Sequence, residues 1–147
     1  MFQHLLVPVD GSELSQRAAE SGIELAAKLG ARLTAFVAEP LPPLPHMGTN
    51  PTVYARDADA HLAQTEQHAR DVLQRIGEKA KAAGVAFAGQ FSRHDSIDDA
   101  IVGAAEEFGC DLIVMATHGR GAFGELLFGA HTKHVLAKSK LPVLVLR

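Results

Sequence analysis

The fold is indicated by the stretch Leu5-Leu6-Val7-Pro8-Val9-Asp10-Gly11-Ser12, in which an apolar strand leads into a turn and a helix cap. Beyond it, apolar residues recur at spacings of three and four up to Leu29, which predicts a helix with one apolar stripe. Gly30 is a suitable C-terminal stop for that helix. The start of the chain is therefore expected to form a strand, a turn and a helix.

The same unit recurs along the rest of the chain. Further strands are expected at 31–37, Val85–Phe91, Leu112–Ala116 and Val143–Leu146. Helices are expected between them at 57–83, 94–108 and 131–139. The last two strands are continuous apolar runs, which burial on both faces of a parallel sheet explains. The sequence thus predicts an α/β fold: a five-stranded parallel sheet with helices on both faces, a Rossmann-like open α/β sandwich in a single domain over residues 1–147.

Composition narrows the classes of function. The chain has 147 residues with a formal net charge of −3, which provides no general attraction to nucleic acid or to an anionic membrane. Its one cysteine, Cys110, excludes an internal disulfide and a cysteine-based zinc module. No apolar run reaches the length of a membrane span, and the start of the chain does not look like a signal peptide. We therefore expect a cytoplasmic protein with neither nucleic acid nor membrane as a partner.

A proline-rich loop interrupts the pattern over residues 40–54. Five of the seven prolines of the chain lie there: Pro40, Pro42, Pro43, Pro45 and Pro51. The loop follows the second strand, at the carboxyl edge of the predicted sheet, where open α/β sheets bind ligands. Two interpretations remain open, a stiff surface loop and a lid or partner-docking loop.

The stretch from Thr117 to Thr132 is rich in glycine and follows the fourth strand. It contains a G-x-G-x-x-G match at Gly119, Gly121 and Gly124, but no acidic residue stands at the end of a following strand to hold a ribose. A dinucleotide fold is therefore disfavoured, and no P-loop motif is present. A glycine-rich loop followed by a helix start after Gly129 can instead direct backbone N–H groups at a phosphate. Arg120 would add a charge to this cradle or remain solvated.

The combination of Val7-Pro8-Val9-Asp10-Gly11-Ser12, Asp111-Leu112-Ile113-Val114-Met115 and Leu141-Pro142-Val143-Leu144-Val145 resembles the universal stress protein family over residues 1–147. This resemblance implies a stress-response module that is a homodimer, paired through the C-terminal strand Val143–Leu146. It also implies an adenine nucleotide ligand, ATP with Mg, in the members that bind one. The other members act without a nucleotide, through protein–protein interaction.

Nucleotide-binding members of that family carry the motif G-x2-G-x9-G-[S/T] after the fourth strand. This chain aligns as Ala116, Gly119, Gly129 and Ala130, so two positions match and the spacing is intact. Ala116 adds one methyl group, which is severe only if the backbone φ is positive there. Ala130 lacks a hydroxyl that could bind phosphate, although Thr132 is near in sequence. We expect a weakened cradle and not a missing one.

The resemblance extends the predicted nucleotide site to other strand ends. Asp10 corresponds to the acidic residue near the adenine and ribose, while Val37 and Met115 would line the adenine pocket. Each also has a simpler interpretation, Asp10 as a helix cap and the other two as core residues. The predicted site comprises Pro8, Val9, Asp10, Val37, Met115, Ala116, His118, Gly119, Arg120, Gly129, Ala130 and His131.

Metal binding and catalysis have little support in the sequence. His131 and His134 share a helix face and His118 lies in the loop before them, but no carboxylate joins this set in the sequence, so we predict no metal site. There is no G-x-S-x-G elbow, and Cys110 enters a buried strand as a structural thiol. At most slow ATP hydrolysis is expected, with His118 as the one candidate to activate water. A phospho-acceptor receiver domain is excluded because Asp10 has no acidic neighbour and the last strand no suitable lysine.

Overall fold

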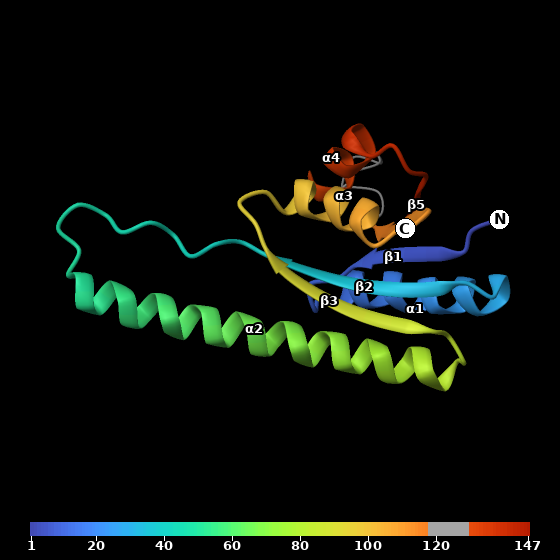
Figure 1. The fold of residues 1–147 in the computed structure, drawn as a ribbon, viewed down its shortest axis with the longest axis horizontal. Helices are drawn as coiled ribbons and strands as arrows, with labels where there is room; N and C mark the ends of the chain where they lie inside the picture. Colours follow the sequence, from blue (N-terminus) through green and yellow to red (C-terminus); the bar gives the residue numbers. More distant parts are fainter. Residues whose placement is uncertain (118–129) are drawn as a thin grey trace.

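The computed structural model describes residues 1–117 and 130–147. The strands in these residues are β1 (His4–Pro8), β2 (Arg32–Glu39), β3 (Phe87–Arg93), β4 (Leu112–Ala116) and β5 (Val143–Leu146). The helices are α1 (Glu13–Leu29), α2 (Pro51–Ala82), α3 (Ile97–Glu107) and α4 (Ala130–Lys138). Strands and helices alternate, and every strand pair is parallel, as Figure 1 shows. The predicted five-stranded parallel α/β sheet is confirmed.

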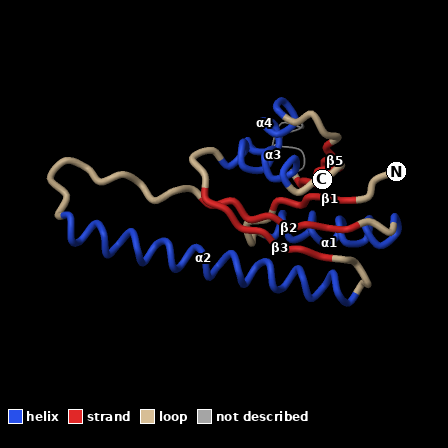
Figure 2. Tube along the Cα trace, in the orientation of Figure 1, coloured by secondary structure: helices blue, strands red, loops and turns tan. Residues whose placement is uncertain are grey.

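The strand order is β3-β2-β1-β4-β5, which places a change of direction beside β1. The chain first builds outward from β1 to β2 and β3, then crosses back so that β4 lies on the other side of β1. α1 and α2 pack on one face of the sheet, and α3 and α4 pack on the other. This gives the three layers seen in Figure 2, with a topological switch point between β1 and β4.

The core consists of two apolar clusters, one on each face of the sheet. Along β1, Leu5 faces the cluster under α1 and α2, while Leu6 faces the cluster under α3 and α4. Both leucines are fully buried, because successive side chains of a strand point to opposite faces and helices cover both. β4 alternates in the same way, with Ile113 and Val114 in different clusters. The continuous apolar run of β4 is therefore explained as predicted.

β5 does not fit that explanation. It is the edge strand of the sheet, and its residues are half-buried or exposed, with Leu144 38% exposed. The prediction that β5 is buried on both faces is wrong, because β5 lies at the edge of the sheet and pairs only with β4 among the described strands. The apolar side chains of β5 therefore stay partly exposed to solvent.

The proline-rich loop is shorter than the predicted range of 40–54. α2 already begins at Pro51, because Asn50 caps the helix: its Oδ1 accepts hydrogen bonds from the N–H groups of Thr52 at 2.9 Å and Val53 at 3.4 Å. Proline is favoured at the first helical position, where its missing N–H costs nothing. The last four residues of the predicted loop, Pro51 to Tyr54, are therefore helical.

We define the arm as Pro40–His61, the loop after β2 together with the first turns of α2. Figure 1 shows it extending well past the sheet. Its base is marked by Arg93 at the end of β3, whose guanidinium donates to the Leu62 carbonyl at 2.8 Å and to the Thr65 hydroxyl at 2.7 Å. The buried residues of α2 all lie beyond this base: Ala69, Val72, Ile76 and Ala80. The sheet-packing half of α2 is thus part of the core, and the arm is not.

Candidate functional site

The sheet opens at its switch point. β1 pairs with β4 at two positions only, Leu5 with Leu112 and Leu6 with Ile113, whereas β1 pairs with β2 at five. β1 continues to Pro8 and β4 to Ala116 without further pairs between these two strands. Separation of neighbouring strands at the carboxyl edge creates the crevice in which open α/β sheets bind ligands.

Asp10 stands directly after β1 in this opening. Its Oδ1 accepts a hydrogen bond from the Ser12 N–H at 2.9 Å, and its own N–H donates to the Ser15 hydroxyl at 3.2 Å. Desolvation opposes ionisation of this carboxyl group, but the hydrogen bonds from Ser12 and Ser15 outweigh it and lower the pKa of Asp10. The N-cap of α1 is Ser12 and not Asp10. Asp10 is therefore an exposed, ionised acceptor at the switch point.

Gly11 and His68 hold the turn that presents Asp10. Gly11 has φ +86°, and a Cβ there would lie 2.9 Å from the imidazole of His68 and 3.1 Å from Val72. His68 Nε2 lies 3.1 Å from the Asp10 carbonyl oxygen, so α2 contacts the turn directly. The sequence places His68 on the polar face of a long helix and gives no signal of this contact, which spans 58 residues.

The two predicted apolar walls of the site are core residues. Val37 is 1% exposed in the cluster under α1 and α2, and Met115 is 7% exposed in the cluster under α3 and α4. Their side chains therefore lie on opposite faces of the sheet. Val9 is also buried, and its N–H donates to the Phe36 carbonyl at 2.9 Å, while Pro8 is half-buried. The structure favours the core interpretation of the Val37 and Met115 side chains.

Ala116 ends β4 on the other side of the opening. Among the described residues only glycines have a positive φ, so alanine fits here without backbone strain. The Thr132 hydroxyl donates to the Ala116 carbonyl at 3.4 Å, and Thr132 is 2% exposed. Thr132 therefore ties α4 to the end of β4, and its hydroxyl does not replace the one that Ala130 lacks.

The remaining predicted residues divide between α4 and the part of the chain before it. α4 is described from Ala130 onward, and the Thr132–Ala116 hydrogen bond places this described part of the helix beside the end of β4. His118, Gly119, Arg120 and Gly129 lie outside the described residues. The backbone phosphate cradle therefore stays a prediction.

A carboxylate that sequence reasoning missed joins the two histidines of α4. Asp98, in the first turn of α3, lies 2.6 Å from Nδ1 of His131 and 2.7 Å from Nδ1 of His134. One turn further, Lys138 pairs with Asp99 at 2.6 Å. These contacts hold α4 against α3, and they explain His131 as a structural partner of Asp98. No cluster with metal-ligating composition occurs among residues 1–117 and 130–147.

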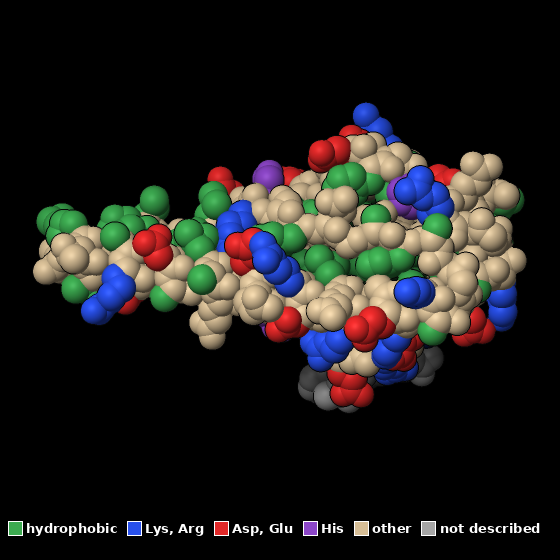
Figure 3. Space-filling view, turned by 60° about the horizontal axis from the view of Figure 1, so that its bottom comes forward, with side chains coloured by type: hydrophobic (Ala, Val, Ile, Leu, Met, Phe, Trp, Pro, Cys, Tyr) green, Lys and Arg blue, Asp and Glu red, His purple; other side chains and the backbone are tan. Residues whose placement is uncertain are grey.

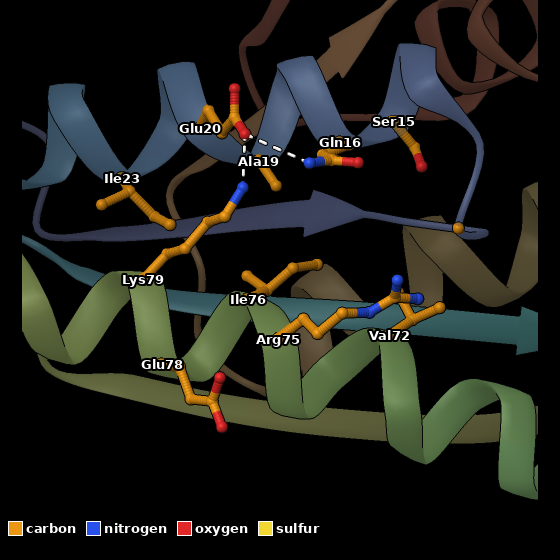
Figure 4. A pocket seen from close by; sticks show the side chains of 11 residues that line it. Ser15, Gln16, Ala19, Glu20, Ile23, Val72, Arg75, Ile76, Glu78 and Lys79 are labelled. Atoms are coloured by element: carbon orange, nitrogen blue, oxygen red, sulfur yellow. Dashed lines mark hydrogen bonds and ion pairs between the residues drawn. The ribbon is translucent and has the colours of Figure 1, made fainter.

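A separate cavity of about 250 Å³ lies between α1 and α2 (Figure 4). Buried Ala19, Ile23, Val72 and Ile76 form its apolar floor. The Glu20–Lys79 ion pair bridges the two helices across it. Gly11 and Ser15 line its end nearest the Asp10 turn. Two regions near β1 could therefore accept a small molecule, and an experiment on ligand binding has to distinguish them.

Two further observations concern the reactivity of the Cys110 thiol and the possibility of a membrane-spanning helix. Cys110 is 6% exposed, and burial raises the pKa of its thiol to about 11, so the thiol is protonated at neutral pH and a poor nucleophile. None of the helices in the described ranges has the length and hydropathy to cross a bilayer.

Comparison with known proteins identifies the family of the chain. A family model described as the universal stress protein family matches residues 1–147. A universal stress protein of Thermus aquaticus is 33% identical over 153 residues, covering 100% of both chains. The crystal structure of a universal stress protein in complex with cAMP is 25% identical, covers 99% of this chain and 97% of that one, and superposes with a TM-score of 0.71.

A universal stress protein from Archaeoglobus fulgidus, solved in complex with dAMP, shares the fold with a TM-score of 0.65 at 18% identity, covering 100% of this chain and 98% of that one. Fold, family model and full-length relatives agree with the resemblance in the strand motifs. The chain belongs to the universal stress protein family.

Proposed function

We propose that this protein is a stress-response module that binds an adenine nucleotide at the switch point between β1 and β4. The observation that carries the proposal is the early end of the β1–β4 ladder, with the ionised Asp10 carboxylate at the opening. Two solved members of the family, in complex with cAMP and with dAMP, support adenine as the shared element of the ligand.

The described residues suit the two polar parts of a nucleotide. Asp10 offers carboxylate oxygens that accept hydrogen bonds from ribose hydroxyls or the adenine amino group. Where the glycine-rich stretch leads into α4, we expect backbone N–H groups and the positive end of the helix dipole to bind a phosphate. Because the Thr132 hydroxyl is bound to the Ala116 carbonyl, we expect it not to contribute to phosphate binding. We therefore expect binding to depend more on the nucleoside than on the number of phosphates.

Self-association through β5 belongs to the same proposal. β5 is an edge strand with exposed Leu144, and unpaired apolar edges favour pairing with a second copy. A homodimer paired along Val143–Leu146 would cover this edge. A Leu144→Lys variant that sediments as a monomer, against a dimeric parent, is the expected result; unchanged dimers would place the interface elsewhere.

A second candidate function is that of a family member without a nucleotide, which acts through protein–protein interaction. The observations that favour it are the two motif departures, Ala116 and Ala130, and the exposed apolar residues of the arm. The two candidates differ in one measurable property, saturable binding of an adenine nucleotide.

The test is calorimetric titration of the purified protein with Mg-ATP, cAMP and, as a base control, Mg-GTP. Asp10→Asn removes the charge at the switch point, and we expect it to weaken adenine nucleotide binding about tenfold or more. Asp59→Asn is the matched control, because Asp59 is also an exposed aspartate and lies on the arm. Ala116→Gly restores the family glycine and should leave affinity unchanged or raise it.

Adenine nucleotides that bind, with an affinity sensitive to Asp10→Asn and insensitive to Asp59→Asn, are the expected outcome. Equal loss in both variants would contradict a site at the switch point. Absence of binding by ATP and cAMP at millimolar concentration, in the parent and in Ala116→Gly, would favour the second candidate.

A further inference from the structure

The arm carries a second binding surface, built from consecutive residues of the proline-rich loop. The segment Pro40-Leu41-Pro42-Pro43-Leu44-Pro45 contains two identical Leu-Pro dipeptides three residues apart. Every residue from Glu39 to Pro45 is either a proline or precedes one. Proline fixes φ, and the residue before a proline is confined to extended conformations, so the segment is restricted to polyproline II geometry.

The segment belongs to no helix or strand, and α2 holds it in place from one side. The Tyr54 hydroxyl, in the first turn of α2, donates to the Pro43 carbonyl at 2.9 Å. Pro42 and Pro43 line a cavity against α2 together with Val53 and Tyr54. This contact fixes the segment before any partner arrives and lowers the conformational entropy that binding would cost.

The side of the segment away from α2 is apolar and exposed. Polyproline II has three residues per turn, so Leu41 and Leu44 share one edge, and Pro42 and Pro45 share the next. Leu41 is 48% exposed and Leu44 84% exposed; Pro45 is exposed and Pro42 half-buried. Figure 3 shows hydrophobic side chains gathered along the projecting arm. Of the large hydrophobic residues exposed in the described chain, half lie on the arm: Leu41, Leu44, Met47 and Val53.

We propose that this segment is a docking ligand for a partner protein with two consecutive aromatic-walled pockets, one accepting Leu41 and the other the Leu44-Pro45 dipeptide. One turn of polyproline II is about 9 Å, which sets the spacing of the two pockets. Grooves of this kind occur in SH3 domains, which recognise P-x-x-P segments through their polyproline II conformation. The segment contains that spacing twice, at Pro40/Pro43 and at Pro42/Pro45.

The occupant is a different protein and not a second copy of this chain. Aromatic-walled pockets use the broad, amphipathic rings of tryptophan and tyrosine. The chain has no Trp, and its one Tyr, Tyr54, is hydrogen-bonded to the segment itself. A second copy therefore has no Trp and only this one Tyr with which to form such a groove.

The test is titration of the ¹⁵N-labelled full-length protein with a purified SH3 domain, monitored by NMR. The amides of Leu41, Leu44 and Met47 report on the segment, since prolines give no amide signal. We expect saturable shifts confined to these residues, and a Leu41→Ala/Leu44→Ala variant that binds about tenfold more weakly or worse. Leu29→Ala/Leu136→Ala is the matched control, because these leucines are 42% and 41% exposed outside the arm.

Three results would overturn the proposal. One is the absence of binding by the SH3 domain at millimolar concentration. Another is equal weakening by the arm and control variants. The third is a change in the sedimentation of the protein alone on Leu41→Ala/Leu44→Ala, which would make a second copy the occupant. Far-UV circular dichroism of both variants confirms that the fold is intact.

Discussion

Two regions of the molecule, the switch point and the arm, are built in opposite ways. The switch point lies between β1 and β4, and its residues come from strands and helices distant in the sequence and brought together by the fold. The arm begins after Glu39, and its surface comes from consecutive residues that the fold leaves exposed. Binding at the switch point should therefore depend on the integrity of the core, while binding by the arm should depend on local sequence alone.

The largest expected difference between the two regions is in stability, and α2 tests it within one helix. Ile76, 6% exposed, packs on the sheet, whereas Val53, 41% exposed, belongs to the arm. Truncation of a buried isoleucine leaves a cavity, so Ile76→Ala should lower the free energy of unfolding by about 2–5 kcal/mol. Val53→Ala should change it by about 0.5 kcal/mol or less. Urea denaturation measures both, and similar losses would show that the arm is part of the cooperative core.

Two glycines with the same backbone angle give the next comparison. Gly11 and Gly48 both have φ +86°, but a Cβ at Gly11 would meet His68 and Val72, while the space around Gly48 on the arm is open. Alanine is strained at both positions, and only Gly11→Ala adds a steric clash. We expect Gly11→Ala to lower the free energy of unfolding by about 1–3 kcal/mol.

Gly48→Ala should cost about 1 kcal/mol or less by the same denaturation measurement. Gly11→Ala should also weaken nucleotide binding, because it displaces the turn that presents Asp10. A Gly48→Ala variant as unstable as Gly11→Ala would contradict the distinction between the two regions.

A pH-dependent difference is expected at Asp111, in the body of the protein. Desolvation opposes its ionisation, but hydrogen bonds from the N–H groups of Gln3 and His4 prevail and lower the pKa of Asp111. A depressed pKa stabilises the fold above the unfolded value of about 3.9, and this contribution is lost as the pH falls through the folded value.

Asp111→Ala should therefore lower stability by about 0.5–1 kcal/mol at about pH 7, because solvent screens this partly exposed carboxylate, with the difference fading at about pH 2. Asp59→Ala, on the arm, should change stability by about 0.5 kcal/mol or less at either pH. Urea denaturation at the two pH values checks both variants. A loss in Asp111→Ala that does not depend on pH would argue against an ionised Asp111 as its cause.

The sequence predicts the body better than it predicts contacts between its parts. Apolar periodicity and the caps at Ser12 and Gly30 were sufficient for the order of strands and helices, because these signals are local. The burial of β5 was predicted wrongly, because an edge strand and a central strand share one composition. The start of α2 was misplaced, because Pro51 reads equally as a loop residue and as the first residue of a capped helix.

The sequence predicts a place in the fold for the candidate site, but not the contacts around it. Its placement at the ends of β1 and β4 follows from topology, which local patterns define. The contact of His68 with the Asp10 turn and that of Asp98 with His131 join helices far apart in the sequence, and no residue pattern marks them. Val37 and Met115 are buried on opposite faces, which follows only from the register of the strands.

The central claim is that an adenine nucleotide binds at the switch point, and mapping amide shifts of the ¹⁵N-labelled protein during titration with Mg-ATP tests it most directly. We predict shifts at Val9, Asp10 and Ala116, with the arm residues Leu44 and Met47 unchanged. Shifts centred instead on Gln16, Arg75 and Lys79 would place the ligand in the cavity between α1 and α2 and contradict the claim. So would a spectrum that does not change at millimolar nucleotide.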